Sequence, residues 1–280
     1  MEKKDFIYSV IQYFLFLSSI FIISASDNIT IAILAKDKAH TLPLYLRCIE
    51  SQTWPKEKTN LYIRTNNNND NTAELLKEWI EKVGDEYAEI FFDDTDVPQQ
   101  IQKYGQHEWN CERFKVLGKI RQDSIVWAYE HNSHYFVVDC DNFIKPHTLE
   151  SVFNVNLPIV APFLFYPGIY YANYHAAVDQ NGYLKESPLY NMIFDQAIKG
   201  LIQVPVVHCC YFIQYSYLPY VSYDDDSYRY EYVIFSDVAR KNNIAQYLDN
   251  RDSYGFITFA ENAEDLNKLW WVESLNSWFN

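Results

Sequence analysis

The chain has 280 residues and a formal net charge of −14, with 37 Asp and Glu against 23 Lys and Arg. This acidic balance argues against a protein that binds nucleic acid, because phosphate contacts need clustered basic side chains. It also argues against docking onto an anionic membrane surface. The 24 tyrosines and 7 tryptophans suit carbohydrate or polypeptide ligands, whose C–H-rich surfaces stack on aromatic faces, but they suit ordinary sheets and cores equally well.

The first 26 residues are typical of a secretory leader. Two lysines precede an apolar run from Phe6 to Ile23, and three small residues follow at 24–26. The run is also long enough for an uncleaved anchor, since about 20 apolar residues span a bilayer. We therefore expect residues 1–26 to be a signal peptide or signal anchor. Residues 27–280 are expected to form one domain that enters the secretory pathway.

From residue 28 onward, apolar runs of strand length alternate with segments of helical spacing, which favours a layered α/β domain. Asn71, with Glu74 three positions later, predicts a capping box at the start of the second helix. Beyond 162 the pattern is mixed, with a loop rich in Tyr and Asp that runs through 228. The predicted strands are 29–35, 61–64, 89–92, 135–138, 159–162, strands near 203–215, and 246–248, and the predicted helices are 41–52, 71–83, 111–131 and 230–242.

Asp139 and Asp141 form a D-x-D motif directly after the apolar strand 135–138. Ligands of open α/β sheets bind where strands end, and carboxylate oxygens are preferred by hard divalent cations such as Mg²⁺ and Mn²⁺. A cation held there would neutralise negative charge on a departing diphosphate. The alternative is that both residues only form a turn.

Three further segments are candidates for binding a nucleotide. The loop from Ala35 to His40 follows the first strand, where a nucleotide packs in such folds. The alternative for His40 is that it starts a helix and faces solvent. The polar run 65–71, which contains Asn67 and Asp70, offers groups that read a uracil or ribose edge, or it is a plain turn. Lys119 and Arg121, two positions apart, are candidates to pair with phosphates. The alternative is that both lie on a solvated helix face.

Two candidates for the reaction itself lie later in the chain. His208 stands in an apolar stretch and is either a third metal ligand beside the D-x-D motif or a core histidine. An acidic cluster follows the Tyr-rich loop and includes Asp226 and Glu231. One of these carboxylates is a candidate base for the proton of an acceptor hydroxyl, whereas most acidic loops are simply solvated.

From about Ile31 to Ile257 the chain resembles glycosyltransferase family 25, in the N-terminal domain of its procollagen-modifying members. Several ordered segments with near-matching spacing carry this resemblance. They are Leu34–Pro43, Asp70–Thr72 with Leu76–Trp79, Arg113-Phe114 with Lys119–Gln122, Asp139–Phe143, Ile159–Pro162, Gly168–Tyr170, Val204–His208 and Asn250–Gly255.

The resemblance implies a GT-A type fold and an inverting transfer from UDP-galactose, with Mn(II) or Mg(II), to hydroxylysine of a collagen-like polypeptide. It implies that Asp139 and Asp141 bind the metal and diphosphate, with His208 as third ligand. Glu231 is then the preferred base, although this chain has Tyr230 where the family has an acid. The implied location is the lumen of the endoplasmic reticulum, or the Golgi or cell exterior without retention.

The chain departs from the family because we expect one such domain where the animal enzymes have two. The donor is therefore galactose or glucose. Two rival functions remain: a catalytically silent adhesion or binding protein of the same fold, and a transferase that acts on a glycan. Membrane contact is expected only through an N-terminal anchor, and the oligomeric state stays open.

Overall fold

The computed structural model describes residues 27–98 and 110–279, so the predicted leader at 1–26 lies outside the described residues. In chain order the strands and helices are β1 (Ile29–Ala35), α2 (Leu42–Glu50), η1 (Lys56–Lys58), β2 (Thr59–Thr65), α3 (Thr72–Val83), η2 (Gly84–Glu86), β3 (Glu89–Asp93), α4 (Cys111–Glu130), β4 (His134–Val138), β5 (Asn142–Ile144), α5 (Thr148–Asn154), β6 (Ile159–Pro162), β7 (Leu164–Phe165), β8 (Tyr174–His175), α6 (Pro188–Phe194), β9 (Leu201–Val204), β10 (Val206–Val207), β11 (Cys210–Ile213), η4 (Tyr215–Tyr220), α7 (Glu231–Lys241), β12 (Gln246–Asp249), β13 (Gly255–Ile257), α8 (Ala263–Asn267) and η5 (Val272–Phe279). Within those described ranges, no helix has both the length and the apolar character needed to cross a membrane.

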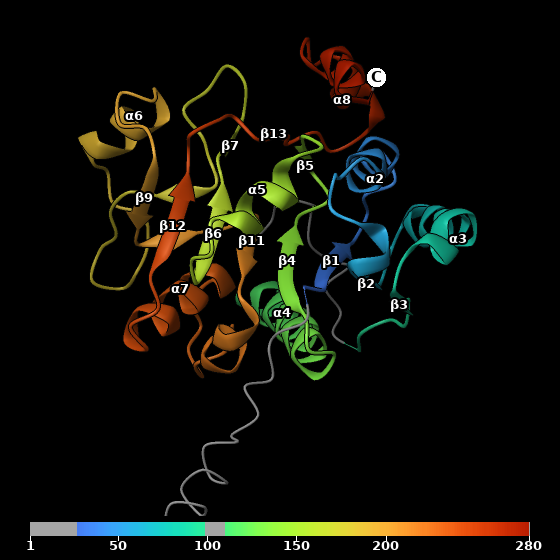
Figure 1. Ribbon diagram of the computed structural model, residues 1–280, viewed down its shortest axis with the longest axis horizontal. Helices are drawn as coiled ribbons and strands as arrows, with labels where there is room; N and C mark the ends of the chain where they lie inside the picture. Colours follow the sequence, from blue (N-terminus) through green and yellow to red (C-terminus); the bar gives the residue numbers. More distant parts are fainter. Residues whose placement is uncertain (1–26, 99–109, 280) are drawn as a thin grey trace, which may run out of the picture.

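An eight-stranded mixed sheet forms the centre of the molecule, in the order β3-β2-β1-β4-β11-β6-β12-β9 (Figure 1). The first four of these strands run parallel, so the carboxyl ends of β1, β2 and β4 lie at the same edge. β11 lies antiparallel between β4 and β6, and Cys210 at its start pairs with Val138 at the end of β4. The start of β11 therefore meets the edge where β1, β2 and β4 end.

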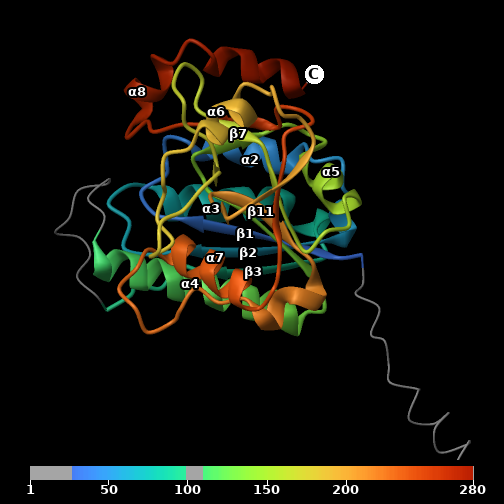
Figure 2. The same cartoon turned by 90° about the vertical axis from the view of Figure 1, so that its left-hand side faces the viewer.

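Alternation along the central strands divides the core between the two faces of the sheet. Phe136 and Val138 of β4 pack into one cluster with α2 and α3, whereas Tyr135 and Val137 face α4 and α7. Figure 2 shows helices on both sides of the strands. All four of these β4 side chains are fully buried. A strand that is buried on both faces appears in the sequence as a continuous apolar run. The strand that leads into the D-x-D motif could therefore be predicted from the sequence.

The second half of the chain adds two small sheets. One has the order β5-β13-β7, and the other pairs β10 with β8. Gly255 in β13 lies against β5 so closely that an added Cβ would be 2.0 Å from the Phe143 carbonyl oxygen. Only glycine permits that approach, because any side chain would overlap the neighbouring backbone.

The predicted strands and helices up to residue 162 are all present, with ends that agree or differ by at most two residues. The predicted capping box is wrong. Asn71 makes no side-chain capping bond, and Asp70 instead accepts from the backbone N–H and the hydroxyl of Thr72 at 3.0 and 2.6 Å. The short elements β5, α5, β7, β8, α6, β13 and α8 were not predicted, because two to seven residues carry too little periodicity.

Candidate functional site

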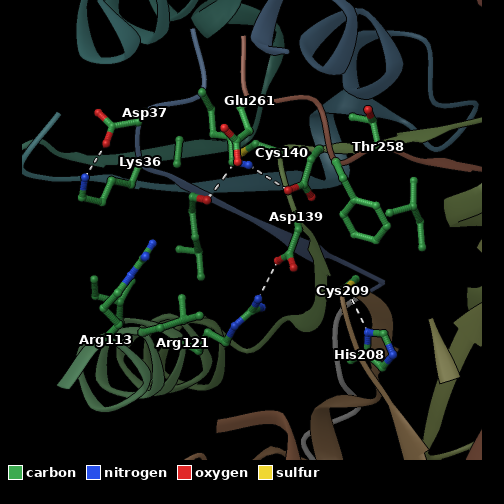
Figure 3. Close-up of a pocket in the computed structure, with 18 of the residues that line it drawn as sticks. Lys36, Asp37, Arg113, Arg121, Asp139, Cys140, His208, Cys209, Thr258 and Glu261 are labelled. Atoms are coloured by element: carbon green, nitrogen blue, oxygen red, sulfur yellow. Dashed lines mark hydrogen bonds and ion pairs between the residues drawn. The ribbon is translucent and has the colours of Figure 1, made fainter. Parts of the chain in front are cut away.

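A cavity of about 1210 Å³ opens at the edge where β1, β2 and β4 end. Its walls come from the loop after β1, the polar turn after β2, the inner face of α4, the residues after β4, the start of β11, the start of α7 and the segment after β13. Figure 3 shows side chains from several of these elements pointing into the same space. This is the edge at which open α/β sheets bind ligands.

Asp139 and Asp141 both line this cavity, directly after β4. The chain turns sharply there, because the N–H of Asn142 donates to the Asp139 carbonyl at 2.9 Å. Asp139 Oδ1 accepts from Arg121 Nη2 at 2.6 Å (Figure 3). Asp141 Oδ2 accepts from Lys38 Nζ at 2.8 Å. Both carboxylates thus lie at the cavity wall and are paired with cations.

Arg121 joins the D-x-D motif to Glu231. Its side chain is buried on α4, with Nη2 at Asp139 and Nε 3.6 Å from Glu231 Oε1. Burial raises the pKa of Glu231 to about 7, against the opposing effect of Arg121. A carboxyl with a pKa near neutrality is suited to accept a proton. Within the described chain, Glu231 Oε2 and Arg121 Nε and Nη1 are buried without hydrogen-bond partners, so this part of the wall has unused bonding capacity.

A glycine on α4 allows Glu231 to come this close. Gly118 lies one turn before Arg121, and a Cβ built on it would be 3.1 Å from the Tyr223 carbonyl oxygen and 3.4 Å from Glu231 Cβ. A Cβ at 118 would crowd the Tyr223 carbonyl in the loop before α7, whereas its 3.4 Å contact with Glu231 Cβ would be an ordinary one. The absence of a side chain at 118 therefore lets this loop and the start of α7 lie close to α4.

His208 lies at the same wall, just before β11. Its neighbour Cys209 has a left-handed backbone with φ of 64°, and the Cys209 carbonyl accepts from the Asp139 N–H at 2.8 Å. His208 Nδ1 is 2.9 Å from Cys209 Sγ (Figure 3). Burial, with smaller effects from His175 and Arg121, lowers the pKa of His208 to about 3. The imidazole is therefore neutral, the form that ligates metals.

The donor chemistry of Asp139 and Asp141 fits a hard divalent cation that takes its other ligands from water and phosphate oxygens. His208 lines the same cavity, yet among the described residues no group of three Asp, Glu, His or Cys side chains is placed to hold a metal. The two carboxylates are turned toward Arg121 and Lys38, and His208 toward Cys209. The three-residue shell stays a prediction that requires these side chains to turn.

The loop after β1 and the polar turn after β2 form the opposite wall. Ala35, His40 and Asp70 all line the cavity. Asp70 Oδ2 accepts from the Ala39 N–H at 3.1 Å, which ties the two segments together. His40 Nε2 is 2.8 Å from the Ala260 carbonyl oxygen, so this ring is held by the segment after β13 instead of facing solvent freely.

The structure places three of the expected site residues elsewhere. Asn67 turns away from the cavity, because its N–H donates to Asp96 Oδ1 at 2.6 Å and its amide contacts the backbone of Val97. The side chain of Lys119 is 75% exposed and pairs with Asp123 one turn along α4. Asp226 is exposed in a turn, where its N–H donates to Asp224 Oδ1 at 3.1 Å. These residues are removed from the candidate site.

Several cavity residues were not singled out from the sequence. Lys38 belongs to the loop named above but was not selected, and Arg121 was weighed only beside Lys119. The spacing of these two helix residues could have separated them, since residues two apart face different sides of a helix. The aromatic wall had no sequence signal beyond the abundance of tyrosine. Its cavity-lining members are Tyr171, His175, Tyr230, Tyr232 and Phe259.

Comparison with known proteins shows which family the chain resembles. A family model described as glycosyltransferase family 25, N-terminal domain, matches residues 26–269. Human procollagen galactosyltransferase 2 is 31% identical over 259 residues, which cover 86% of this chain and 41% of the human protein. Procollagen galactosyltransferase 1 of Danio rerio is 30% identical over 243 residues, with 82% and 40% covered. The chain thus spans about two fifths of the length of these relatives.

The family also has members described as inactive. Human inactive glycosyltransferase 25 family member 3 is 27% identical over 244 residues, which cover 82% of this chain and 40% of that protein. Among solved structures, S. aureus TarS 1-349 in complex with UDP-GlcNAc matches with a TM-score of 0.54 and 14% identity, covering 87% of this chain and 61% of TarS. That likeness confirms the predicted GT-A type α/β fold. On the strength of the family match across most of its length, the chain belongs to glycosyltransferase family 25 and carries the N-terminal domain of that family.

Proposed function

We propose that this chain is a metal-dependent, inverting glycosyltransferase that moves galactose or glucose from a UDP-sugar to a hydroxyl of a collagen-like polypeptide. One observation carries the proposal: the D-x-D carboxylates and the buried Glu231 meet in a single cavity, joined by Arg121. The names of the procollagen galactosyltransferase relatives support the donor and the acceptor.

The donor would bind between the D-x-D turn and the loop after β1. Asp139 and Asp141 would hold Mn(II) or Mg(II), and the bound cation would supply positive charge that stabilises the diphosphate as it leaves. Lys38, now paired with Asp141 at 2.8 Å, would be available to phosphate oxygens once that carboxylate has another partner. Ala35, His40 and Asp70 would then contact the nucleoside from the opposite wall.

The proposed reaction is a single displacement at the anomeric carbon of the sugar. A bond forms between the acceptor oxygen and this carbon while the bond to the diphosphate oxygen breaks, and UDP departs with the electron pair. Glu231 takes the proton of the acceptor hydroxyl, and Arg121 orients the Glu231 carboxylate. Attack from the face opposite UDP inverts the anomeric configuration. Positioning of both substrates by the cavity supplies much of the remaining rate acceleration.

The location follows from the same proposal. A transferase for a collagen-like polypeptide meets its acceptor in the secretory pathway, and the leader expected at residues 1–26 would direct the chain there. We propose the lumen of the endoplasmic reticulum as its site of action.

The decisive experiment measures UDP release from UDP-galactose and UDP-glucose with Mn(II) present and after chelation. We expect release that requires the metal and that increases when a hydroxylysine-containing peptide is added. A chain that binds UDP but releases none from either donor with any acceptor would instead be a silent relative, as the family members described as inactive suggest.

A further inference from the structure

His175 is a buried polar residue of the cavity wall to which the proposed reaction gives no role. It lies at the end of β8, lines the cavity and is only 7% exposed. Within the described residues, its Nδ1 atom is buried without a hydrogen-bond partner. Buried polar atoms are almost always paired, because an unpaired one keeps the full cost of losing its water. A ligand in the cavity would supply the missing partner.

The strand that carries His175 is held firmly in place. Asn173, two residues earlier, is fully buried, and its amide donates to the carbonyl oxygens of Pro162 at 2.8 Å and Cys210 at 3.2 Å. His175 itself is paired with Val206 in the two-stranded sheet of β8 and β10. These bonds tie β8 to β6, β11 and β10, so the imidazole has a fixed position from which to recognise a ligand.

The ring of His175 lies between the D-x-D motif and the candidate base. Its centroid is 5.4 Å from that of the His208 ring and 5.8 Å from that of the Tyr232 ring, with interplanar angles of 62° and 87°. The residue after His208 accepts the backbone N–H of Asp139 at 2.8 Å with its carbonyl oxygen. Tyr232 directly follows Glu231 at the start of α7. His175 therefore contacts one ring from each end of the reaction site.

In the proposed reaction the donor sugar lies at this position. Its anomeric carbon is bonded to the diphosphate held at the D-x-D motif and is attacked by the acceptor oxygen that faces Glu231. A sugar hydroxyl both donates and accepts a hydrogen bond. Burial lowers the pKa of His175 to about 4, so the ring is neutral and has one N–H donor and one acceptor nitrogen. Its bonding groups match those of a hydroxyl.

We propose that His175 hydrogen-bonds a hydroxyl of the donor sugar and that this contact makes the cavity select a UDP-sugar over UDP alone. The inference rests on the proposed function, which supplies the position of the sugar. It adds a residue that recognises the sugar itself, whereas the residues named above bind the diphosphate, the nucleoside or the acceptor proton.

The test is titration calorimetry on the full chain with Mn(II) and without acceptor, using UDP, UDP-galactose and UDP-glucose as ligands. His175→Ala should raise the Kd of the UDP-sugar that the wild type binds more tightly by roughly tenfold, as expected for one buried hydrogen bond. The Kd of UDP should stay at the wild-type value, which also shows that the variant folds. His175→Asn keeps an amide donor and acceptor close to the position of Nδ1, so it should recover part of the lost affinity.

His147→Ala is the matched control, because the His147 side chain is 44% exposed beside Asp252 and is not part of the cavity lining. Its Kd values should equal those of the wild type. Equal rises in the Kd of UDP and of the UDP-sugar in His175→Ala would show a purely structural role. An unchanged UDP-sugar Kd in this variant would show that His175 does not contact the sugar. Either result would overturn the inference.

UDP release is measured separately, so the two proposals can fail independently. A chain that binds the UDP-sugar through His175 yet releases no UDP refutes the proposed function and leaves this inference standing. A chain that releases UDP, with the same UDP-sugar Kd for the wild type and His175→Ala, refutes the inference and leaves the proposed function standing. A wild type that binds neither UDP-sugar overturns both.

Discussion

The two halves of the chain build their share of the site in different ways. Up to residue 138 the chain forms parallel strands whose ends lie at one edge, so each loop after a strand reaches the cavity by topology alone. After 139 the wall comes from strands of two to four residues and from rings that are distant in sequence. Regular pairing fixes the first wall, whereas side-chain packing and close backbone contacts fix the second.

Substitutions in the D-x-D motif, where the two halves of the chain join, should have the largest effect on the rate of transfer. Asp141→Asn keeps the shape of the side chain but removes the charge that would hold a cation, so we expect transfer to fall on the order of a thousandfold. The measurement is the initial rate at subsaturating Mn(II). Asp123→Asn, which removes an exposed partner of Lys119 on α4, should leave the rate unchanged. Equal rates for Asp141→Asn and the wild type would show that transfer does not depend on the charge of Asp141.

The second half should be sensitive to backbone spacing. Gly255→Ala would place a methyl group 2.0 Å from the Phe143 carbonyl oxygen, and β13 would have to separate from β5. We expect a loss of about 3 kcal/mol in the free energy of unfolding, measured by urea denaturation. Gly84→Ala is the control, because its methyl would meet Ile90 Cδ1 at an ordinary 3.4 Å. Equal stability of the two variants would contradict the packing described for the second half.

The smallest of the three effects concerns proton transfer between the halves. Burial raises the pKa of Glu231 to about 7, so the proposed base is ionised above that pH and protonated below it. The wild-type rate should therefore fall as the pH drops through about 7. Glu231→Gln should lower kcat roughly a hundredfold and abolish this dependence, since an amide cannot accept the proton. A pH profile that is the same in both proteins would show that a residue other than Glu231 is the base.

The sequence predicted the regular half of the fold and the part of the site that depends on it. Buried strands such as 135–138 are legible as apolar runs, and the position of Asp139 and Asp141 at a strand end follows from them. Glu231 at the start of α7 was also predicted, as a member of an acidic cluster. The sequence did not predict that Glu231 is buried and Asp226 exposed. This difference depends on the approach of α7 to α4 at Gly118.

The aromatic wall of the cavity and the burial of Arg121 could not be predicted from the sequence, for a related reason. Tyr171 and Phe259 are 88 positions apart and meet only because β7, β5 and β13 form their own sheet. The burial of Arg121 on a helix of mixed polarity has no signature in periodicity. Long-range pairing of short strands and the choice of which polar residue is buried are both tertiary effects.

The antiparallel placement of β11 beside β4 has a consequence for how the cavity could change during evolution. Its ladder fixes the level of His208 relative to Asp139, because Cys210 pairs with Val138. A slip of two residues would move one strand along the other by roughly 7 Å and carry the histidine out of reach of the acids. Insertions in the loops on either side can alter the cavity mouth without disturbing that alignment, so the chemistry can persist while acceptor choice drifts.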